Sequence, residues 1–152
     1  MGFLQQIKAT CYLYTIMQDK ILFYILSYDV WFYFSHLLLH TKYGYAWIHK
    51  HHHAVNYRTM RYSDAYVGHM LESPLQGMGM LFPLIFIEFE YIPFLWALLF
   101  VNVRGMMRHD PRFECLTGNH HLLHHQFPTC NFGEFWIDYI MNSDYDYLFV
   151  SR

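Results

Sequence analysis

Residues 21–39 read ILFYILSYDVWFYFSHLLL, and this stretch decides the fold class because nearly every side chain in it is apolar or aromatic. An α-helix of that length rises roughly 28 Å, close to the hydrocarbon thickness of a bilayer, about 30 Å. Asp29 lies in the middle of the run, and an ionisable group at that depth normally faces protein or water. We therefore predict a membrane-spanning helix here.

The composition of the whole chain also indicates a membrane protein. Of its 152 residues, 55% are hydrophobic, 21% aromatic and only 14% charged, whereas about 25% are charged in ordinary globular chains. This length predicts one domain, residues 1–152. The formal net charge of −2 argues against a nucleic-acid partner, which requires a basic surface.

Two further apolar regions flank a polar middle. Residues 1–17 are moderately apolar, and the polar triplet at 18–20 predicts a turn that would make a first hairpin with residues 21–39. A second apolar block, residues 74–103, contains Glu88 and Glu90. Two arms of about fourteen residues would each rise roughly 21 Å, so this block predicts a hairpin with the glutamates at its tip. We expect an all-α integral membrane protein with about four membrane helices in two hairpins.

Two features place the polar regions on the cytosolic side. Cys11, Cys115 and Cys130 form no CxxC pair and are odd in number, which argues against a disulfide framework and favours a reducing environment. Basic residues follow both apolar regions, and by the positive-inside rule they mark the cytoplasmic face. These basic residues are Lys42, Lys50, Arg58, Arg61, Arg104, Arg108 and Arg112.

Histidines follow the first long apolar run at regular spacing. One pair is spaced i, i+4, and two later triplets share the pattern HxxHH, which places each set on one face of a helix. Eight imidazoles exceed what one ion needs, so the pattern predicts two five- or six-coordinate metal ions. The eight are His36, His40, His49, His52, His53, His121, His124 and His125.

Some neighbouring histidines are less well placed. His51 and His120 lie off the shared faces, although His120 and His124 would be an equally valid i, i+4 pair. We favour His121 because it reproduces the spacing of residues 49–53. Imidazole suits iron, zinc, copper and nickel alike, and the absence of a thiolate cluster argues against a structural zinc site.

The motifs HLLLH, HKHHH and HHLLHH, with NFGEFWIDYI after them, resemble the fatty acid hydroxylase/sterol desaturase superfamily. The stretches YDVWFYFSHLLLH, GHMLESP and RGMMRHDPRF are also similar to that family, so the resemblance covers residues 25–142. It implies membrane helices that support a cytosolic histidine-box cap holding two iron ions. It also implies an integral membrane location, in the endoplasmic reticulum if the source is eukaryotic.

The resemblance suggests two further metal ligands. His69, in HMLE, matches a position that reads HPxE in many relatives, although this chain has Met70 where Pro is common. His109, in RHD, resembles the histidine that precedes the third box. For both residues the alternatives are a role in packing, or a contact with a metal ligand instead of with the metal itself.

Other polar residues gain expected roles in the same way. Asn102 could act on a metal through water or could be a polar contact of the hairpin, and Asn131 looks like the family's structural asparagine. Glu72, Asp110 and Asp138 are expected to fix imidazole tautomers, with surface positions as the alternative.

The implied activity is O₂-dependent hydroxylation of a fatty acyl or sterol-like C–H bond, with no catalytic residue beyond the metal ligands. Desaturation is the nearest alternative. Lipid or sterol would be the substrate, and electrons would come from a separate donor such as a cytochrome b5-type protein.

Other classes stay open. A non-oxidative membrane zinc protein is a second class, although the chain lacks HExxH, and zinc could also substitute for iron. A bis-histidine haem protein would place single histidines deep within spans, and a degenerate, non-enzymatic relative is a further alternative.

Overall fold

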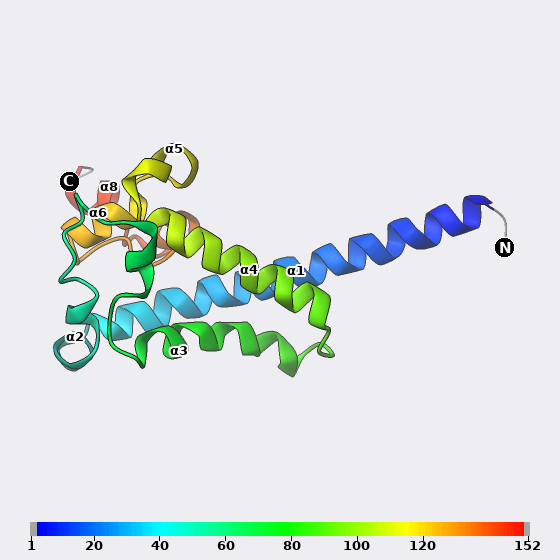
Figure 1. The fold of residues 1–152 in the computed structure, drawn as a ribbon, viewed down its shortest axis with the longest axis horizontal. Coiled ribbons are helices and arrows are strands. Elements are labelled where there is room, and N and C mark those ends of the chain that lie inside the picture. Colours follow the sequence, from blue (N-terminus) through cyan, green and yellow to red (C-terminus); the bar gives the residue numbers. More distant parts are fainter. Residues whose placement is uncertain (1–2, 151–152) are drawn as a thin grey trace.

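The computed structural model describes residues 3–150, and within that range the chain is helical and contains no strand, which confirms the predicted all-α class. One long helix, α1 (Phe3–Leu39), runs through the molecule, and a hairpin packs along its second half (Figure 1). Short segments gather where α1 ends, and we call residues 40–71 and 109–150 the cap. They are α2 (Lys42–Trp47), η1 (His49–His51), η2 (Tyr62–Tyr66), η4 (Pro111–Phe113), α5 (Glu114–Thr117), α6 (His120–Gln126), α7 (Phe135–Met141) and α8 (Tyr145–Phe149).

The predicted turn at residues 18–20 is wrong, because α1 continues through it without a break. Gln, Asp and Lys are tolerated inside helices, and the triplet holds no Gly or Pro to end one. Lys20 instead forms an ion pair with Glu90 of the hairpin. Within the described residues one helix, Leu4–Leu39, is long and apolar enough to cross a membrane, so the expectation of four membrane helices is not confirmed.

The hairpin predicted for residues 74–103 is present. Its first arm is α3 (Glu72–Gly77), continued by the 3-10 helix η3 (Met78–Ile85), and its second arm is α4 (Tyr91–Arg108). Glu88 and Glu90 lie in the connection between the arms, at the predicted tip. The hairpin therefore reverses the chain and brings α4 back to the cap.

Small and apolar side chains pack the hairpin against α1. A Cβ atom on Gly79 would lie 2.7 Å from the Cβ of Trp31, so only glycine allows η3 to approach α1 this closely. The buried core between α1, η3 and α4 consists of Tyr24, Met80, Ala97 and Val101. Burial of this apolar surface fixes the hairpin on the half of α1 that leads to the cap.

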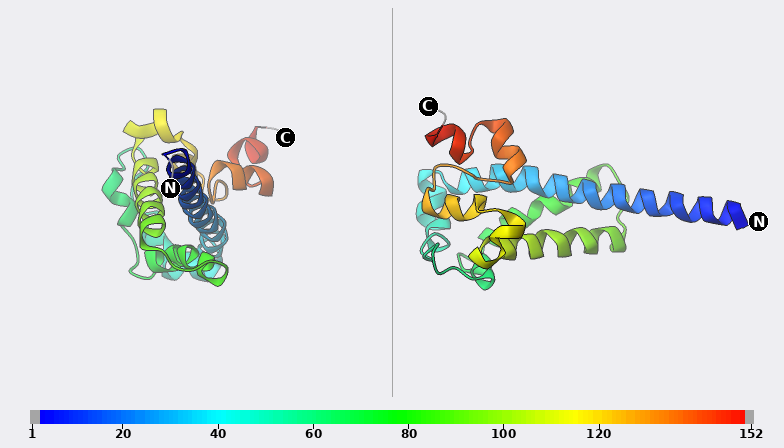
Figure 2. Two further views of the ribbon diagram at one scale, coloured as in Figure 1. Left: turned by 90° about the vertical axis from the view of Figure 1, so that its right-hand side faces the viewer. Right: turned by 90° about the horizontal axis from the view of Figure 1, so that it is seen from above.

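Buried charges join the same helices to the cap. Asp29 of α1 pairs with Arg104 of α4, and Glu134 of the cap pairs with both Arg104 and Arg108. The Arg108 guanidinium also lies over the Phe32 ring, 4.6 Å from its centroid. Figure 2 shows α7 and α8 on the opposite side of α1 from α4, so the chain before α7 passes beside the end of α1.

Candidate metal centre

The cap and the end of α1 bring nine imidazoles into two groups. In each group, one nitrogen of every ring lies within 4.8 Å of the others. The first group is His36, His40, His49, His53 and His124, and the second is His52, His109, His121 and His125. Each group contains residues from segments far apart in the sequence, so the two sites exist only in the folded chain.

Three rings of the first group are held by hydrogen bonds from Nδ1. His36 donates to the carbonyl oxygen of Phe132 at 2.5 Å, and His124 donates to that of Cys130 at 2.6 Å. His49 donates to the carboxylate of Glu72 at 2.7 Å. A carbonyl or carboxylate oxygen only accepts, so these bonds place the ring proton on Nδ1 and leave Nε2 with a free lone pair.

Two rings of the second group are fixed in the same way. His52 Nδ1 donates to the carbonyl oxygen of Val67 at 2.9 Å, and His109 Nδ1 donates to that of Gly105 at 2.6 Å. His109 follows the last turn of α4, so the carbonyl it reaches is one that the helix end leaves without a helical partner. The Nε2 lone pairs of both rings therefore point away from the backbone.

These lone pairs face one another. The Nε2 atoms of His36 and His49 are 2.9 Å apart, and those of His52 and His109 are 3.1 Å apart. With the protons on Nδ1, neither atom of such a pair can donate to the other, so the approach is repulsive unless a cation lies between them. Neutral imidazoles converging in this way fit a metal ion.

Burial keeps the rings neutral. It lowers the pKa of His40 to about 3, of His49 to about 4 and of His53 to about 2, and adjacent imidazoles lower those of His40 and His53 further. Burial also lowers the pKa of His109 well below its ordinary value. Since the neutral imidazole is the ligand, all these groups are available for metal at pH 7.

The second group also contains buried nitrogen atoms without hydrogen-bond partners in the described chain, namely Nδ1 of His121 and both ring nitrogens of His125. Such atoms cost free energy unless a ligand satisfies them. With nitrogen donors and no thiolate in either group, the sites suit first-row transition metals.

The structure brings together the eight histidines predicted from spacing, and His109 joins them. It does not bring His69 to either group. The ring of His69 instead accepts a hydrogen bond from the Leu71 backbone N–H, 3.2 Å from Nδ1, and lies 6.5 Å from the His51 ring.

Each HxxHH motif divides between the two groups. His49 and His53 join the first group and His52 the second, while His124 joins the first and His121 the second. Both motifs therefore run between the two sites rather than facing one.

His51 and His120, expected to lie off the shared faces, have other environments. His51 is exposed. His120 donates from Nε2 to Asp138 at 3.0 Å. Asp138 is fully buried and also accepts from the backbone N–H groups of Phe132 and Gly133, at 2.8 and 2.7 Å. Asp138 thus fixes the loop whose carbonyl groups orient His36 and His124.

Of the other polar residues expected to support the histidines, some have the predicted role and one does not. Glu72 orients His49, as predicted. Asp110 instead accepts from the Tyr62 backbone N–H at 3.2 Å and from the Arg112 side chain, so within the described chain it orients no histidine. Asn131 has the scaffold role expected of it: it adopts a positive φ of 57° and donates to the carbonyl oxygen of His120 at 2.8 Å.

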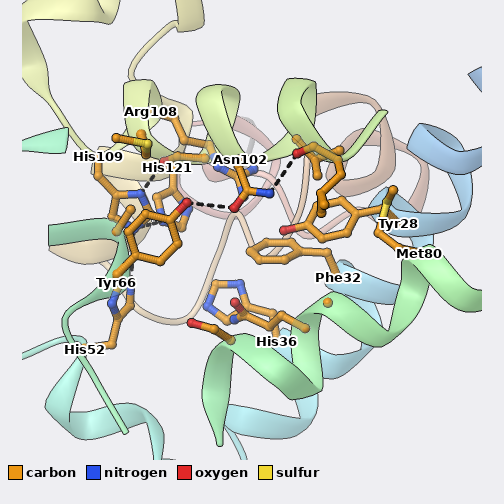
Figure 3. Close-up of a pocket in the computed structure, with 18 residues that line it drawn as sticks. Tyr28, Phe32, His36, His52, Tyr66, Met80, Asn102, Arg108, His109 and His121 are labelled. Carbon is orange, nitrogen blue, oxygen red and sulfur yellow. Dashed lines mark hydrogen bonds between the residues drawn. The ribbon is translucent and has the colours of Figure 1, made fainter. Parts of the chain in front are cut away.

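A cavity of about 210 Å³ opens beside the histidines (Figure 3). Its inner end is lined by His36, His52, His109 and His121. The walls of the cavity come from α1, α3, η2, η3 and α4. Tyr66 of η2 is one of the lining residues, and no pattern in the sequence marked it as part of the site. A molecule in this cavity would lie against both histidine groups.

A model of the fatty acid hydroxylase family matches residues 21–143. The chain belongs to this family. Fatty acid hydroxylase family proteins are hydroxylases and desaturases, generally oxidoreductases, and are typically iron-dependent and membrane-associated. All nine grouped histidines lie within the matched region. Searches among curated proteins and among solved structures returned no significant match.

Proposed function

We propose that the chain is a membrane-bound, two-iron oxygenase that hydroxylates a C–H bond of a lipid with O₂. The observation that carries this proposal is the convergence of Nε2 lone pairs in two adjacent groups, with tautomers fixed by Nδ1 hydrogen bonds. Family membership supports the reaction class and the metal.

We propose that α1 and the hairpin are embedded in the membrane. From Lys20 to Leu39, α1 rises roughly 30 Å, which matches a hydrocarbon core. The Lys20–Glu90 pair marks one end of this stretch, and the histidines mark the other. Three embedded arms, α1, α3–η3 and α4, replace the four helices expected from the sequence, and the Lys and Arg residues of the cap favour a cytoplasmic position for the metal centre.

The nine imidazoles would hold the two irons, which would supply the oxidising power that an unactivated C–H bond requires. The protein's own contribution is position and exclusion of water. Carbonyl groups of the loop at 130–133 and the carboxylate of Glu72 fix the rings, while Phe32 and Met80 provide apolar walls beside the histidines. The substrate can thus stay in the membrane while its reacting carbon reaches the cap.

Reducing electrons would come from a separate protein, such as a cytochrome b5-type donor. The cap is the part of the chain that such a donor could reach, because eight of the nine grouped histidines belong to it.

The test is product analysis after turnover. Protein purified without oxygen and loaded with iron is given a chemical reductant, O₂ and a mixed lipid extract. We expect a lipid that gains one oxygen atom, derived from ¹⁸O₂, and no product with His124→Ala. The exposed His51→Ala serves as the matched control and should remain active. A product lacking two hydrogens would identify a desaturase, while turnover with zinc or without O₂ would contradict the proposal.

A further inference from the structure

We propose that one face of α7 rests on the lipid bilayer beside α1 and seats the cap on the membrane surface. We call it the outer face of α7, and it consists of Phe135, Trp136, Tyr139 and Ile140. The inference goes beyond the proposed reaction, but it rests on the proposed placement of α1 in the membrane. Three observations carry it: the two-sided pattern of α7, the contacts that fix its orientation, and the apolar surface of α1 next to it.

The two sides of α7 differ sharply in exposure. Ile137 and Asp138 point inward and are 5% and 0% exposed, whereas the four side chains of the outer face are between 39% and 68% exposed. The outer positions are spaced i, i+1, i+4 and i+5, which places them on one side of a helix. The rings of Phe135 and Tyr139 stack, with centroids 6.2 Å apart. The outer face is therefore a continuous aromatic and aliphatic surface without a charged group.

Polar contacts hold α7 in this orientation. Glu134, directly before the helix, pairs with Arg104 and Arg108 of α4. On the inner side, the buried carboxylate of Asp138 accepts from the Ser143 hydroxyl at 2.8 Å. Turning the outer face inward would break these contacts and leave buried polar groups unpaired, which is costly. The fold thus keeps four large apolar side chains on the surface.

The inner side of α7 packs on the part of α1 that leads to the cap. Ile137 shares a buried cluster with Tyr33 of α1 and with Phe132, and the Tyr33 hydroxyl lies 3.1 Å from the hydroxyl of Ser143. Exposed apolar side chains of α1 lie one turn before Tyr33, beside it and one turn after it; they are Val30, Phe34 and Leu37. An apolar surface therefore continues from α1 onto α7, on the side of α1 away from α4 (Figure 2).

The position of α7 along α1 matches that of an interfacial helix. Tyr33, which α7 covers, precedes Leu39 at the end of α1 by roughly 9 Å along the helix axis. With Lys20–Leu39 in the membrane, this level is the boundary between head groups and acyl chains. Interfacial helices bury their apolar face about 5–10 Å into that boundary, and Trp and Tyr side chains are enriched there. The depth and the composition of the outer face thus agree.

A lipid surface fits the outer face better than a protein partner does. A standard protein–protein interface involves about 20–30 residues on each side, whereas the outer face has four. Exposed apolar patches on protein surfaces commonly mark contacts with membranes or with other proteins. Because the outer face adjoins a helix placed in lipid, the same bilayer covers both and no further molecule is needed. Proteins of this family are membrane-associated.

The contact also bears on the metal centre. α7 follows the loop at 130–133, whose carbonyl groups orient His36 and His124. A helix seated at the interface holds this loop at one level relative to the acyl chains. The outer face therefore sets the depth at which the histidine groups meet the membrane.

Quenching of a fluorophore at single positions tests the inference without turnover. The full chain carries Cys11→Ser and Cys115→Ser, whereas Cys130 is buried and stays. A nitrobenzoxadiazole label is attached to one introduced cysteine at a time, and each variant is placed in phosphatidylcholine nanodiscs. The quenchers are phosphatidylcholine with a doxyl group at acyl carbon 5 or 12, which acts from within the bilayer, and iodide, which acts from water.

Three positions are compared. Ile140→Cys reports on the outer face, Phe34→Cys on the exposed side of α1, and Thr59→Cys on an exposed polar position of the cap. We expect the doxyl lipid to quench the label at Ile140 about threefold more than the label at Thr59, and iodide to show the reverse order. Because an interfacial helix lies near the head groups, the doxyl group at carbon 5 should quench the Ile140 label more than the one at carbon 12.

Two results would overturn the inference. Iodide quenching at Ile140 as strong as at Thr59 would show that the outer face lies in water. Protection from both kinds of quencher would show that protein, such as a second copy of the chain, covers it. If Ile140→Cys does not fold, the same measurement at Phe135→Cys, at the other end of the face, decides the question.

The label in α1 separates this inference from the proposed function. A label at Phe34 that lipid quenches, together with a label at Ile140 that only iodide quenches, would refute the seating of α7 alone. A label at Phe34 that only iodide quenches would contradict the proposed placement of α1 in the membrane as well.

Discussion

His36 in α1 donates from Nδ1 to the backbone carbonyl of Phe132, 2.5 Å away, although the two residues are 96 positions apart in the chain. The bond ties the end of α1 to the loop after the third histidine motif. The next anchor is Asp138, which accepts two backbone N–H groups of that loop and the Ser143 hydroxyl at 2.8 Å. The orientation of a proposed metal ligand therefore depends on a carboxylate that touches no metal.

Asp138→Asn places an amide where a buried carboxylate accepts from four donors. One N–H of the amide would face donors, the loop would shift, and His36 and His124 would lose their fixed direction. Substitution of residues that orient metal ligands typically lowers metal affinity 10–100-fold. We expect a loss of about that size in the affinity for iron, measured by competition with a chelator. Glu114→Gln, an exposed carboxylate on α5, is the control. Equal affinity in both variants would show that the loop does not orient the site.

Glu72→Gln removes the charge that His49 faces while keeping an acceptor oxygen. A carboxylate raises the basicity of the imidazole it accepts from, so we expect weaker binding of metal to the first group, by about tenfold, and little change at the second. Binding of Co²⁺ to each variant, monitored by the visible absorption of the bound ion, would give the affinities of the two sites separately. Glu88→Gln, at the exposed hairpin tip, should leave both unaffected, and a loss confined to the second group would contradict the assignment.

His121→Ala and His120→Ala separate a proposed ligand from a scaffold residue. His121 lies in the second group, whereas His120 bonds to Asp138. We expect the first variant to bind about one metal ion per chain and the second to keep about two. His120→Ala should instead lower the free energy of unfolding by about 1–3 kcal/mol, because the buried carboxylate of Asp138 loses one of its hydrogen-bond donors. Two metal ions in His121→Ala would show that the register is wrong.

The Asp29–Arg104 pair should contribute more to the fold than the Lys20–Glu90 pair. Removing one partner of a buried pair costs about 3–5 kcal/mol, whereas an exposed pair is worth about 0–1 kcal/mol. The Asp29 side chain is 3% exposed and that of Glu90 is 49% exposed. In detergent, Arg104→Met should therefore lower the Tm much more than Lys20→Met. The double variant Asp29→Leu/Arg104→Met should recover part of the loss, and a double variant less stable than Arg104→Met alone would contradict this account.

Metal retention should extend to unusually low pH. Protons compete with metal for imidazole as the pH falls through the pKa of the ring. Ordinary histidines are mostly protonated at pH 5.5, but burial lowers the pKa of His49 to about 4 and that of His40 to about 3. We expect the same metal content after dialysis at pH 7.5 and at pH 5.5, with release closer to pH 4. Loss of half the metal by pH 5.5 would show that the rings titrate normally.

Local spacing predicted much of the site but not its division. The i, i+4 and HxxHH patterns identified eight of the grouped histidines, although each HxxHH motif divides between the two groups instead of facing one. Which ring joins which group depends on how three distant segments meet, and residues 49–51 form a 3-10 rather than an α-helical turn. The carbonyl groups of Val67, Cys130 and Phe132 carry no signal in the sequence, since every residue has one.

The fold, too, could be predicted from the sequence only in part. Hydrophobic runs and the two glutamates predicted the hairpin, but the polar triplet at 18–20 did not make a turn. Lys20 of this triplet pairs instead with Glu90, 70 residues away, and no local pattern predicts such a pairing. His69 matched a family position in sequence, yet the bend after η2 turns its ring toward the backbone of Leu71 instead.

The metal content of the intact chain tests the central claim most directly. Protein purified anaerobically after growth in iron-rich medium is analysed by mass spectrometry for metals and by X-ray absorption for the ligands around iron. The account predicts about two iron ions per chain, with nitrogen as the dominant protein donor. One ion or none per chain, or a sulfur-rich coordination shell, would contradict it.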